Sequence, residues 1–326
     1  MKTKIIFFLI AALLIVSLTA CGNADQERNR VETTAGSLDG KQTITIGYLP
    51  ITHALAIFEE KELLDAEDAG IQIELIKFGS WTDLTDALNS GQIDGASVLI
   101  ELAMSAAGSG IDLKAAALGH KDGNVIIVSN DINSVEELKG KTFAIPSNQS
   151  SHNILLNDML KDSGLTAEDL TVTQLAPAEM PSSLANGSID GYCVAEPFGA
   201  QAVVQGYGKV LYQSDELWEN SQCCAFVLNH KFIKENEEAA DLLVSWYLEA
   251  GKALDANTSQ QIAEKYLGQN EETLEESLKW IRYDDLELTE EDYAVLREKV
   301  ISYGINDNPP SYEDFVYKPK QKDSEE

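Results

Sequence analysis

A chain of 326 residues with 44% hydrophobic side chains is long enough for two domains and apolar enough to give each a core. Its 54 acidic and 24 basic residues give a formal net charge of −30 at pH 7, which argues against nucleic acid as a partner because the phosphates would be repelled. The charge says little about the fold, and most acidic side chains are expected to solvate helix surfaces.

Residues 1–20 are typical of a secretory signal, because two lysines precede an uncharged, mostly apolar run that is too short for a comfortable membrane span. The sequence LTAC, ending at Cys21, follows at once and resembles a bacterial lipobox, in which the peptide is removed and the cysteine thiol is lipid-modified. A plain secretory signal with a chance cysteine is the alternative. We therefore expect a lipoprotein, anchored by palmitate-like acyl chains on Cys21 to the extracytoplasmic face of the cell membrane.

Residues 21–42 are polar and show no apolar period, which predicts a flexible tether, and no later stretch of sequence is apolar enough to span a bilayer. The remaining cysteines are Cys193, Cys223 and Cys224, an odd number that cannot all pair internally. Small buried thiols are therefore expected in place of a disulfide framework. No Cys/His spacing resembles a zinc site and the histidines lack a local ligand pair, so no metal is expected.

From residue 43 onward, short apolar runs alternate with helix-like segments, which predicts an α/β fold. Thr52 is expected to cap a helix that follows the first strand, and Ser80 has the spacing of a cap pair with Asp83. The predicted strands of this half are residues 43–48, 71–78, 93–98, 113–118 and 125–129.

The second half repeats this plan. Ser134 and Glu137 have the spacing of a capping box for a short helix, and residues 149–151 lead into another helix. The predicted strands are residues 141–145, 170–175, 189–195 and 223–228. From residue 232 the sequence is mostly helical, with predicted helices over residues 239–254, 260–267, 271–280 and 290–303.

One ten-residue phrase occurs twice, as SGQIDGASVL at residues 90–99 and as NGSIDGYCVA at residues 186–195. Its period is too long for a solenoid repeat and suits two lobes of similar build. In each copy a glycine is expected to stop a helix and an isoleucine to enter the core. Asp94 and Asp190 are expected to bond backbone amides in the tight turn between helix and strand.

Two chain crossings should join the lobes. The strand over residues 125–131 is predicted to leave the first lobe, and the strand over residues 223–229 to return to it. Two crossings make a hinge, about which the lobes can close over a ligand held by loops at the carboxyl ends of strands. The expected division is residues 43–126 with 225–316 for lobe 1, 127–224 for lobe 2, and 317–326 for a polar tail.

Several of these features together resemble a known family. The lipobox, the tether, GYLP at residues 47–50, NSGQIDGA at residues 89–96 and GYCVAEPFGAQAV at residues 191–203 are similar to the solute-binding proteins of ABC importers, in the branch for nitrate, sulfonate, taurine and thiamine-precursor uptake. The similarity covers roughly residues 43–257. It implies a type II periplasmic-binding-protein fold with a central ligand cleft, and a monomeric lipoprotein that delivers a small-molecule solute to a membrane permease.

Two strand-to-helix junctions are candidates for ligand contacts. Residues 149–152 (QSSH) offer free backbone amides, hydroxyls and a helix dipole, which suit an anion, although a serine there can equally be a plain helix cap. Thr52 and His53 hold the equivalent place in lobe 1, where His53 is either a hydrogen-bond donor to the ligand or an ordinary first-turn histidine. Trp81 is either a wall of the ligand site or a core residue.

Glu196 follows a predicted strand and is expected either to pair with an amine or amidine of the ligand or to bond amides of the opposite lobe. Glu101 offers the same pairing and is less favoured, and His120 is expected to be structural. The expected ligand-binding residues are Pro50, Thr52, His53, Ser80, Trp81, Gln149, Ser150, Ser151, His152, Glu196 and Phe198.

The sequence contains no phosphate loop, nucleophile elbow or His-Glu-x-x-His motif, so neither enzyme activity nor a cofactor is expected. Helix N-termini with Ser and His donors favour an oxyanion solute such as a sulfonate, nitrate or taurine. Trp81, Tyr192, Phe198 and Glu196 favour a flat heterocycle such as a thiamine or pyrimidine precursor. The expected ligand-facing loops, residues 48–53, 78–81, 98–101, 146–152 and 195–198, contain no Lys or Arg. The rival functions are an enzyme acting on a bound heterocycle and a surface lipoprotein that binds another protein.

Overall fold

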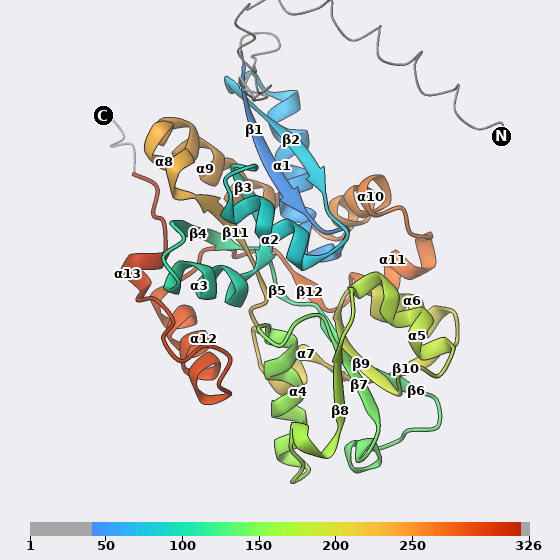
Figure 1. The fold of residues 1–326 in the computed structure, drawn as a ribbon. Coiled ribbons are helices and arrows are strands. Elements are labelled where there is room, and N and C mark those ends of the chain that lie inside the picture. Colours follow the sequence, from blue (N-terminus) through green and yellow to red (C-terminus); the bar gives the residue numbers. More distant parts are fainter. Residues whose placement is uncertain (1–40, 321–326) are drawn as a thin grey trace, which may run out of the picture. The chain divides into compact units, whose positions relative to one another are not determined.

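The computed structural model describes residues 41–320, which contain two five-stranded sheets and the helices that cover them (Figure 1). The α/β class predicted from the alternation of segments is confirmed. The predicted signal peptide, Cys21 and nearly all of the predicted tether lie outside the described residues, as does the end of the polar tail. Within residues 41–320, no helix is long and apolar enough to cross a membrane.

The first sheet has the strand order β2-β1-β3-β11-β4, in which β1 is parallel to β2 and β3 while β11 is antiparallel to both of its neighbours. Its strands are β1 (Gln42–Tyr48), β2 (Ile71–Lys77), β3 (Gly95–Leu99), β4 (Leu113–Leu118) and β11 (Cys224–Asn229). The helices of this half are α1 (Leu55–Ala66), preceded by a 3-10 turn over Thr52–Ala54, α2 (Trp81–Asn89) and α3 (Ile100–Gly108).

The second sheet has the order β10-β6-β9-β7-β8 and the same plan, since β7 is parallel to β8 and β9 while β6 is antiparallel to its neighbours. Its strands are β6 (Asn124–Ser129), β7 (Thr142–Ile145), β8 (Thr171–Gln174), β9 (Gly191–Ala195) and β10 (Gly208–Gln213). Its helices are α4 (Ser151–Asp162), α5 (Met180–Ala185), α6 (Phe198–Val204) and α7 (Ser214–Leu217), with 3-10 turns over Val135–Leu138, Ala167–Asp169 and Pro177–Glu179.

The chain crosses between the sheets through residues 119–123 and again through residues 218–223. Within the first crossing, β5 (Lys121–Asp122) pairs with β12 (Ile281–Arg282). The Asp122 carboxylate accepts the Ser221 backbone N–H at 2.8 Å and lies 2.9 Å from the guanidinium of Arg282. The two crossings and the C-terminal region are therefore joined at one buried carboxylate, that of Asp122.

The C-terminal region contacts the helices of both sheets. α9 and α10 pack on α1 beside the first sheet, whereas α11 packs on α6 beside the second, as Figure 1 also shows. Lys299 of α12 lies 2.8 Å from the Asp158 carboxylate of α4. The helices of this region are α8 (His230–Glu235), α9 (Glu237–Ala253), α10 (Ala256–Leu267), α11 (Glu271–Ser277), α12 (Glu290–Ser302) and α13 (Tyr312–Phe315).

The repeated phrase forms the same joint in both sheets. Gly91 and Gly187 follow α2 and α5 with φ of 70° and 73°, a left-handed conformation that suits glycine. The Asp94 carboxylate accepts the backbone N–H of Thr45 at 2.8 Å, and Asp190 accepts that of Thr142 at 2.8 Å. The predicted role of these carboxylates was right in kind but wrong in partner, because the amide comes from the neighbouring parallel strand and not from the turn.

Several local predictions were wrong. β10 was not predicted, although it forms one edge of the second sheet. Thr52 does not cap a helix, since Ile51 holds that position, and the Ser134 side chain makes no cap hydrogen bond. β6 lies wholly in the second sheet, so the chain leaves the first sheet before it and not along it. The three described cysteines are free and buried, as expected.

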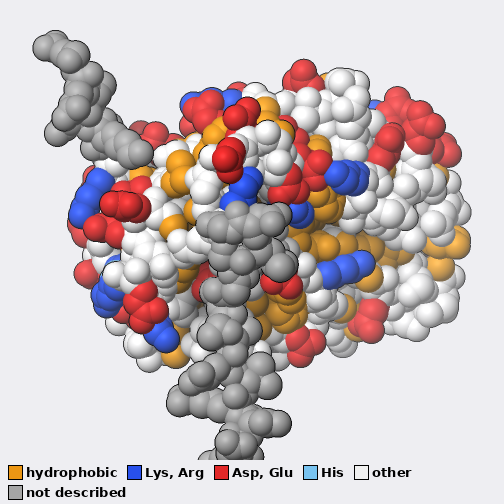
Figure 2. All heavy atoms as spheres, turned by 90° about the horizontal axis from the view of Figure 1, so that it is seen from above, with side chains coloured by type: hydrophobic (Ala, Val, Ile, Leu, Met, Phe, Trp, Pro, Cys, Tyr) orange, Lys and Arg blue, Asp and Glu red, His pale blue; other side chains and the backbone are white. Residues whose placement is uncertain are grey.

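The acidic side chains are spread over the surface. On the face in Figure 2, Asp and Glu lie among basic and apolar side chains over much of the molecule and form no single continuous field. This distribution agrees with the expectation that the carboxylates mainly solvate helix surfaces.

Candidate functional site

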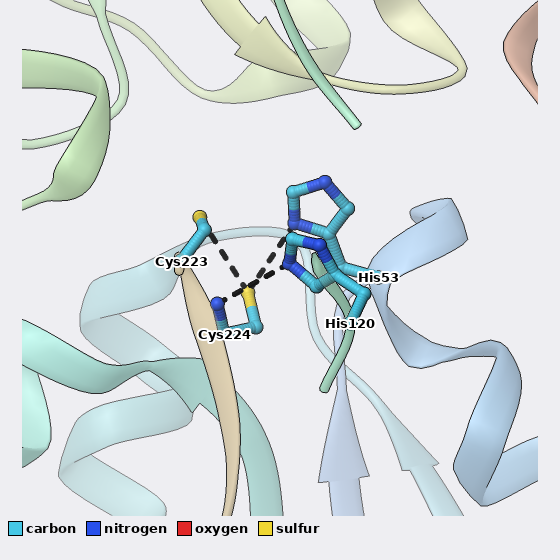
Figure 3. Close-up of side chains that lie close together, drawn as sticks. All are labelled: His53, His120, Cys223 and Cys224. Atoms are coloured by element: carbon cyan, nitrogen blue, oxygen red, sulfur yellow. Dashed lines mark hydrogen bonds between the residues drawn. The ribbon is translucent and has the colours of Figure 1, made fainter. Parts of the chain in front are cut away.

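Four potential metal-ligating side chains meet where the first sheet joins the hinge (Figure 3). His53 comes from the 3-10 turn, His120 from the first crossing, Cys223 from the end of the second crossing and Cys224 from the first residue of β11. All four are fully buried, and one ligating atom of each lies within 4.8 Å of the others. We call this set, His53, His120, Cys223 and Cys224, the imidazole–thiol cluster.

The two imidazoles of the cluster are oriented by backbone carbonyls. His53 Nε2 lies 3.1 Å from the Gly123 carbonyl and His120 Nδ1 lies 2.6 Å from the Asp122 carbonyl. Because a carbonyl can only accept, each of these nitrogens carries the proton, and the other nitrogen of each ring has a free lone pair. Both nitrogens face Cys224: His53 Nδ1 lies 3.5 Å from its Sγ, and His120 Nε2 accepts its backbone N–H at 3.3 Å.

Burial sets the protonation of these groups. The pKa of His120 is lowered to about 4 by its burial and by the adjacent His53 ring, so the imidazole is neutral at pH 7. Burial opposes ionisation of Cys223, but the neighbouring Cys224 thiol and the imidazoles around it hold the pKa of Cys223 well below its usual value. The pKa of Cys224 is raised by burial and by Cys223.

A second group of polar side chains joins the two sheets beside the cluster. Glu101 from α3 faces Ser151 from α4, and both Glu101 and His152 lie near Cys223. All are buried, and neither the Glu101 carboxyl, the Ser151 hydroxyl nor the His152 ring has a hydrogen-bond partner in the described protein. Buried polar groups normally have partners, so these atoms mark a place where a ligand can supply them.

The protonation states of this second group make it uncharged. Burial raises the pKa of Glu101 well above its usual value, and the neighbouring Cys223 raises it further, so the protonated form of the carboxyl is favoured. Burial lowers the pKa of His152 to about 4, so its ring is neutral. Together with Ser151 they offer a mixture of donors and acceptors without a net charge.

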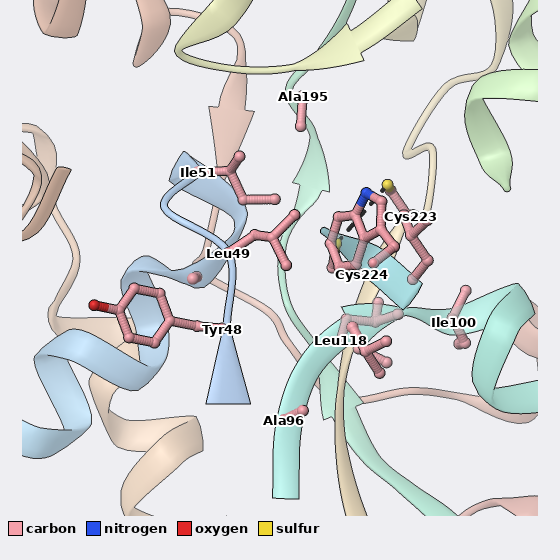
Figure 4. Packing of buried hydrophobic residues seen from close by; sticks show 14 of the residues in the cluster. Tyr48, Leu49, Ile51, Ala96, Ile100, Leu118, Ala195, Cys223 and Cys224 are labelled. Carbon is pink, nitrogen blue, oxygen red and sulfur yellow. Dashed lines mark hydrogen bonds between the residues drawn. The ribbon is translucent and has the colours of Figure 1, made fainter. Parts of the chain in front are cut away.

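Two further buried side chains lack partners. The Trp81 indole N–H, at the start of α2, and the Asn124 amide, directly after the first crossing, make no hydrogen bond within the described protein. Apolar side chains lie near the cysteines: Figure 4 shows Leu49, Ile100 and Leu118 near Cys223 and Cys224, with Ile51 beyond Leu49 and Ala195 of the second sheet above them. The candidate site therefore combines an apolar frame with a few inward polar groups, as small-molecule sites do.

The two halves are fastened to each other beside this site. The Thr52 backbone N–H and hydroxyl both donate to the Glu196 carbonyl, at 2.8 Å and 3.0 Å, and the Tyr283 hydroxyl donates to the Thr52 carbonyl at 2.8 Å. Gln149 adds a second link, because its side-chain amide donates to the Ser105 hydroxyl of α3 at 3.1 Å. Thr52 and Gln149 are therefore interlobe contacts.

We expect Thr52→Val to weaken closure without unfolding the protein. The variant loses the hydroxyl bond to Glu196 but keeps the backbone bond and the side-chain shape, which costs about 1 kcal/mol of contact between the lobes. For a ligand that binds the closed form, the Kd should then rise about 5-fold. Isothermal titration calorimetry measures this, with exposed Thr82→Val as the matched control; equal Kd values for both variants would contradict the role given to Thr52.

The Glu196 side chain does not bond amides of the opposite lobe, and its pairing with an amine or amidine of the ligand stays a prediction. Its carboxyl accepts the Ala200 N–H at 2.8 Å within its own lobe, and it is the backbone carbonyl that crosses to the other lobe. Burial raises the pKa of Glu196 to about 8 although the N–H groups of Ala200 and Gly199 lower it in part, and Glu276 raises it further. The buried carboxyl is thus neutral at pH 7.

The other predicted site residues divide into caps and inward groups. Ser80 caps α2 by accepting the Asp83 N–H, as predicted, and Ser150 caps α4 by accepting the Asn153 N–H. Phe198 is buried, and its carbonyl accepts the Tyr192 hydroxyl, while Pro50 is half-buried at the end of β1. Of the remaining predicted residues, His53 lies in the imidazole–thiol cluster, and Trp81, Ser151 and His152 are buried with polar atoms that have no partner in the described protein.

Sequence reasoning did not include Glu101, His120, Cys223, Cys224 or Asn124 in the site. The cysteines carried a signal, because a CC pair at the start of a strand that follows a lobe crossing lies near the hinge. Glu101 was assigned to a loop but lies in the first turn of α3. Local spacing could not reveal the cluster, because Cys224 is 171 residues from His53 and 104 from His120 in the sequence.

Comparison with known proteins agrees with this architecture. A ligand-binding component of an ABC-type import system from Staphylococcus aureus, solved with zinc bound, is 37% identical, has a TM-score of 0.82, and the match covers 85% of this chain and 97% of that chain. A putative aliphatic sulfonates-binding protein of Escherichia coli is 25% identical over 226 residues, which are 68% of this chain and 70% of the relative. The nitrate import ATP-binding protein NrtC of Synechocystis is 25% identical over 257 residues, which cover 72% of this chain but span 38% of that relative's length.

These matches confirm the two-lobed type II periplasmic-binding-protein fold and the resemblance to solute-binding proteins of ABC importers that the sequence motifs indicated. The family model described as the NMT1-like family matches residues 38–268, which is more than half of the chain. The chain therefore belongs to the NMT1-like family.

Proposed function

We propose that this protein is the extracytoplasmic solute-binding lipoprotein of an ABC importer. The two lobes, which are built on the two five-stranded sheets, close over a small solute, and the closed form delivers it to the membrane permease. Cys21 carries the lipid anchor, the protein acts as a monomer, and it binds its solute without transforming it. Membership of the NMT1-like family and similarity to components of ABC-type import support this proposal.

One observation carries the binding role. Glu101 from one lobe, and Ser151 and His152 from the other, are buried at the junction with polar atoms that lack partners in the described protein. Leaving each such group unsatisfied costs about 1–3 kcal/mol. A ligand that reaches groups of both lobes recovers this free energy and thereby favours the closed form.

The charge of these groups favours a neutral heterocycle over an oxyanion. Among the described residues, no lysine or arginine is buried. A sulfonate or nitrate enclosed here would lack a cationic partner, and an unpaired buried charge is costly. A protonated carboxyl, a neutral imidazole and a hydroxyl suit the alternating donors and acceptors of a thiamine- or pyrimidine-type ring, for which the Trp81 indole offers an aromatic surface.

We expect pyrimidine and thiamine-precursor compounds to bind the full-length protein in detergent, and nitrate, taurine and alkanesulfonates not to bind. His152→Ala should raise the Kd for the bound heterocycle about 10-fold or more, because it removes one inward hydrogen-bonding ring. Glu101→Gln should have a smaller effect, because an amide imitates a protonated carboxyl. Isothermal titration calorimetry in the presence of a metal chelator measures each Kd.

The control is His230→Ala, which removes a histidine that is bonded to Asp112, away from the junction. Its Kd should equal that of the wild type. Tight binding of an oxyanion with no response to any heterocycle would overturn the solute class. Conversion of a bound heterocycle to a new compound would favour the enzyme alternative, and failure of every small molecule would favour a protein partner.

A further inference from the structure

The geometry points to a tetrahedral binding site for a Zn²⁺-like divalent cation in the imidazole–thiol cluster. This inference goes beyond solute capture and does not depend on which solute is imported. The four side chains of the cluster offer two nitrogen and two sulfur donors, the combination that zinc and similar borderline-soft ions prefer.

The distances within the cluster match the edges of such a site. A tetrahedral zinc with Zn–S bonds of about 2.3 Å and Zn–N bonds of about 2.0–2.1 Å separates two sulfurs by about 3.8 Å, and a sulfur from a nitrogen by about 3.5 Å. The two cysteine Sγ atoms lie 3.9 Å apart, and Cys224 Sγ lies 3.5 Å from His53 Nδ1. The other ligating atoms lie within 4.8 Å of one another, and the two imidazole rings are stacked with their centroids 3.5 Å apart, so the rings must turn apart for one ion to take all four ligands.

The atoms around the cluster prepare the histidines as metal ligands. A metal-binding imidazole normally donates its other N–H to a carbonyl or carboxylate, which fixes the tautomer. The Gly123 and Asp122 carbonyls do this for His53 and His120. His120 Nε2 gives up its contact with the Cys224 N–H on binding metal, but at 3.3 Å that bond is already long.

Charge balance also favours a divalent ion in this buried place. Binding converts two thiols to thiolates and releases their protons to solvent, so that Zn²⁺ with two thiolates and two neutral imidazoles is uncharged overall. An uncharged site avoids the penalty of burying a net charge. Next to the cluster, His152 has two unpartnered ring nitrogens and Glu101 has two unpartnered oxygens. The surroundings of the cluster are therefore polar and can accommodate an ion.

The position of the site gives the ion a mechanical role. His53 belongs to the loop after β1, His120 to the first crossing, Cys223 to the end of the second crossing and Cys224 to the first residue of β11. With all four positions filled by protein ligands, the site is of the closed, structural kind and leaves no vacancy for substrate water. A bound ion would clasp lobe 1 to both strands of the hinge.

The test is cobalt and zinc binding by the full-length protein in detergent with a phosphine reductant. Near one equivalent of Co²⁺, we expect the thiolate-to-metal charge-transfer band and the intense visible bands of a four-coordinate ion, which Zn²⁺ then removes. Cys224→Ser and His53→Ala should each lower the affinity for Co²⁺ at least 100-fold. Cys193→Ser is the matched control, because Cys193 is also a free, fully buried thiol but lies in β9, outside the cluster.

Two results would overturn the site: cobalt bands that persist unchanged in Cys224→Ser, or a spectrum of the wild type without thiolate charge transfer. Should a variant fail to fold by circular dichroism, zinc X-ray absorption of the wild type decides instead. Two sulfur neighbours at about 2.3 Å support the site, and a shell of nitrogen and oxygen alone refutes it. Because solute binding is measured with a chelator present, failure of either test leaves the other result standing.

Discussion

Glu196→Gln is expected to stabilise the folded protein by an amount that grows from about pH 5 to about pH 8 and then levels off. Burial raises the pKa of Glu196 from 4.5 to about 8, so the unfolded chain ionises this carboxyl first. Its contribution to stability is therefore complete below the unfolded pKa and is lost as pH rises through the folded pKa. At about 1.4 kcal/mol per pKa unit, the loss is on the order of 5 kcal/mol.

Urea unfolding of both proteins at several pH values measures the effect. Glutamine imitates the protonated acid and can still accept the Ala200 N–H, so the variant should lack the pH-dependent loss. The groups that face this carboxyl are Glu276 of α11, which raises its pKa, and Tyr192, which stays protonated over this range. Exposed Glu74→Gln is the control. A stability difference for Glu196→Gln that does not change between pH 5 and pH 8 would contradict the assignment.

Asp94→Ala is expected to lower the free energy of unfolding by about 2–4 kcal/mol at pH 7. The Asp94 carboxylate accepts both the backbone N–H and the hydroxyl of Thr45, each at 2.8 Å, and so holds the end of α2 to the neighbouring strand. Bonds to a charged acceptor contribute about 1.5–3 kcal/mol each, and truncation also leaves the Thr45 groups without this partner. Thermal and urea unfolding measure the change.

Two comparisons sharpen this result. Asp94→Asn keeps an accepting oxygen without the charge and should cost about half as much. Asp65→Ala removes an exposed carboxylate that pairs with Lys61 one helical turn away, and it should cost less than about 0.5 kcal/mol. Equal free energies of unfolding for Asp94→Ala and Asp65→Ala would show that the Asp94–Thr45 hydrogen bonds do not stabilise the fold.

The sequence sufficed for features that depend on local chemistry. The strands of each parallel core, the stop of α2 at Gly91 and the Ser80 cap follow from apolar runs, a left-handed glycine and a short polar side chain, and all are present. The duplicated phrase predicted two similar halves for the same reason. The sequence did not predict β10, because this strand pairs with β6, whose residues are distant in the chain.

The candidate site was predicted less well than the fold because its members meet only after long-range pairing. The strand-to-helix junction predicted a site at residues 149–152, but these residues have different roles. Ser150 caps the helix, whereas the Ser151 and His152 side chains are buried without partners in the described protein. The cap depends on local sequence alone. The Ser151 and His152 side chains form part of a candidate site only because Glu101 of the other lobe faces them in the folded protein. No spacing rule contains that information.

The C-terminal region changes how such a hinge can move. α9 and α10 sit on one lobe, α11 sits on the other, and Lys299 is bonded to Asp158 on that second lobe. The C-terminal region therefore connects the two lobes a third time, in addition to the two crossings. This third connection limits how far the two sheets can separate.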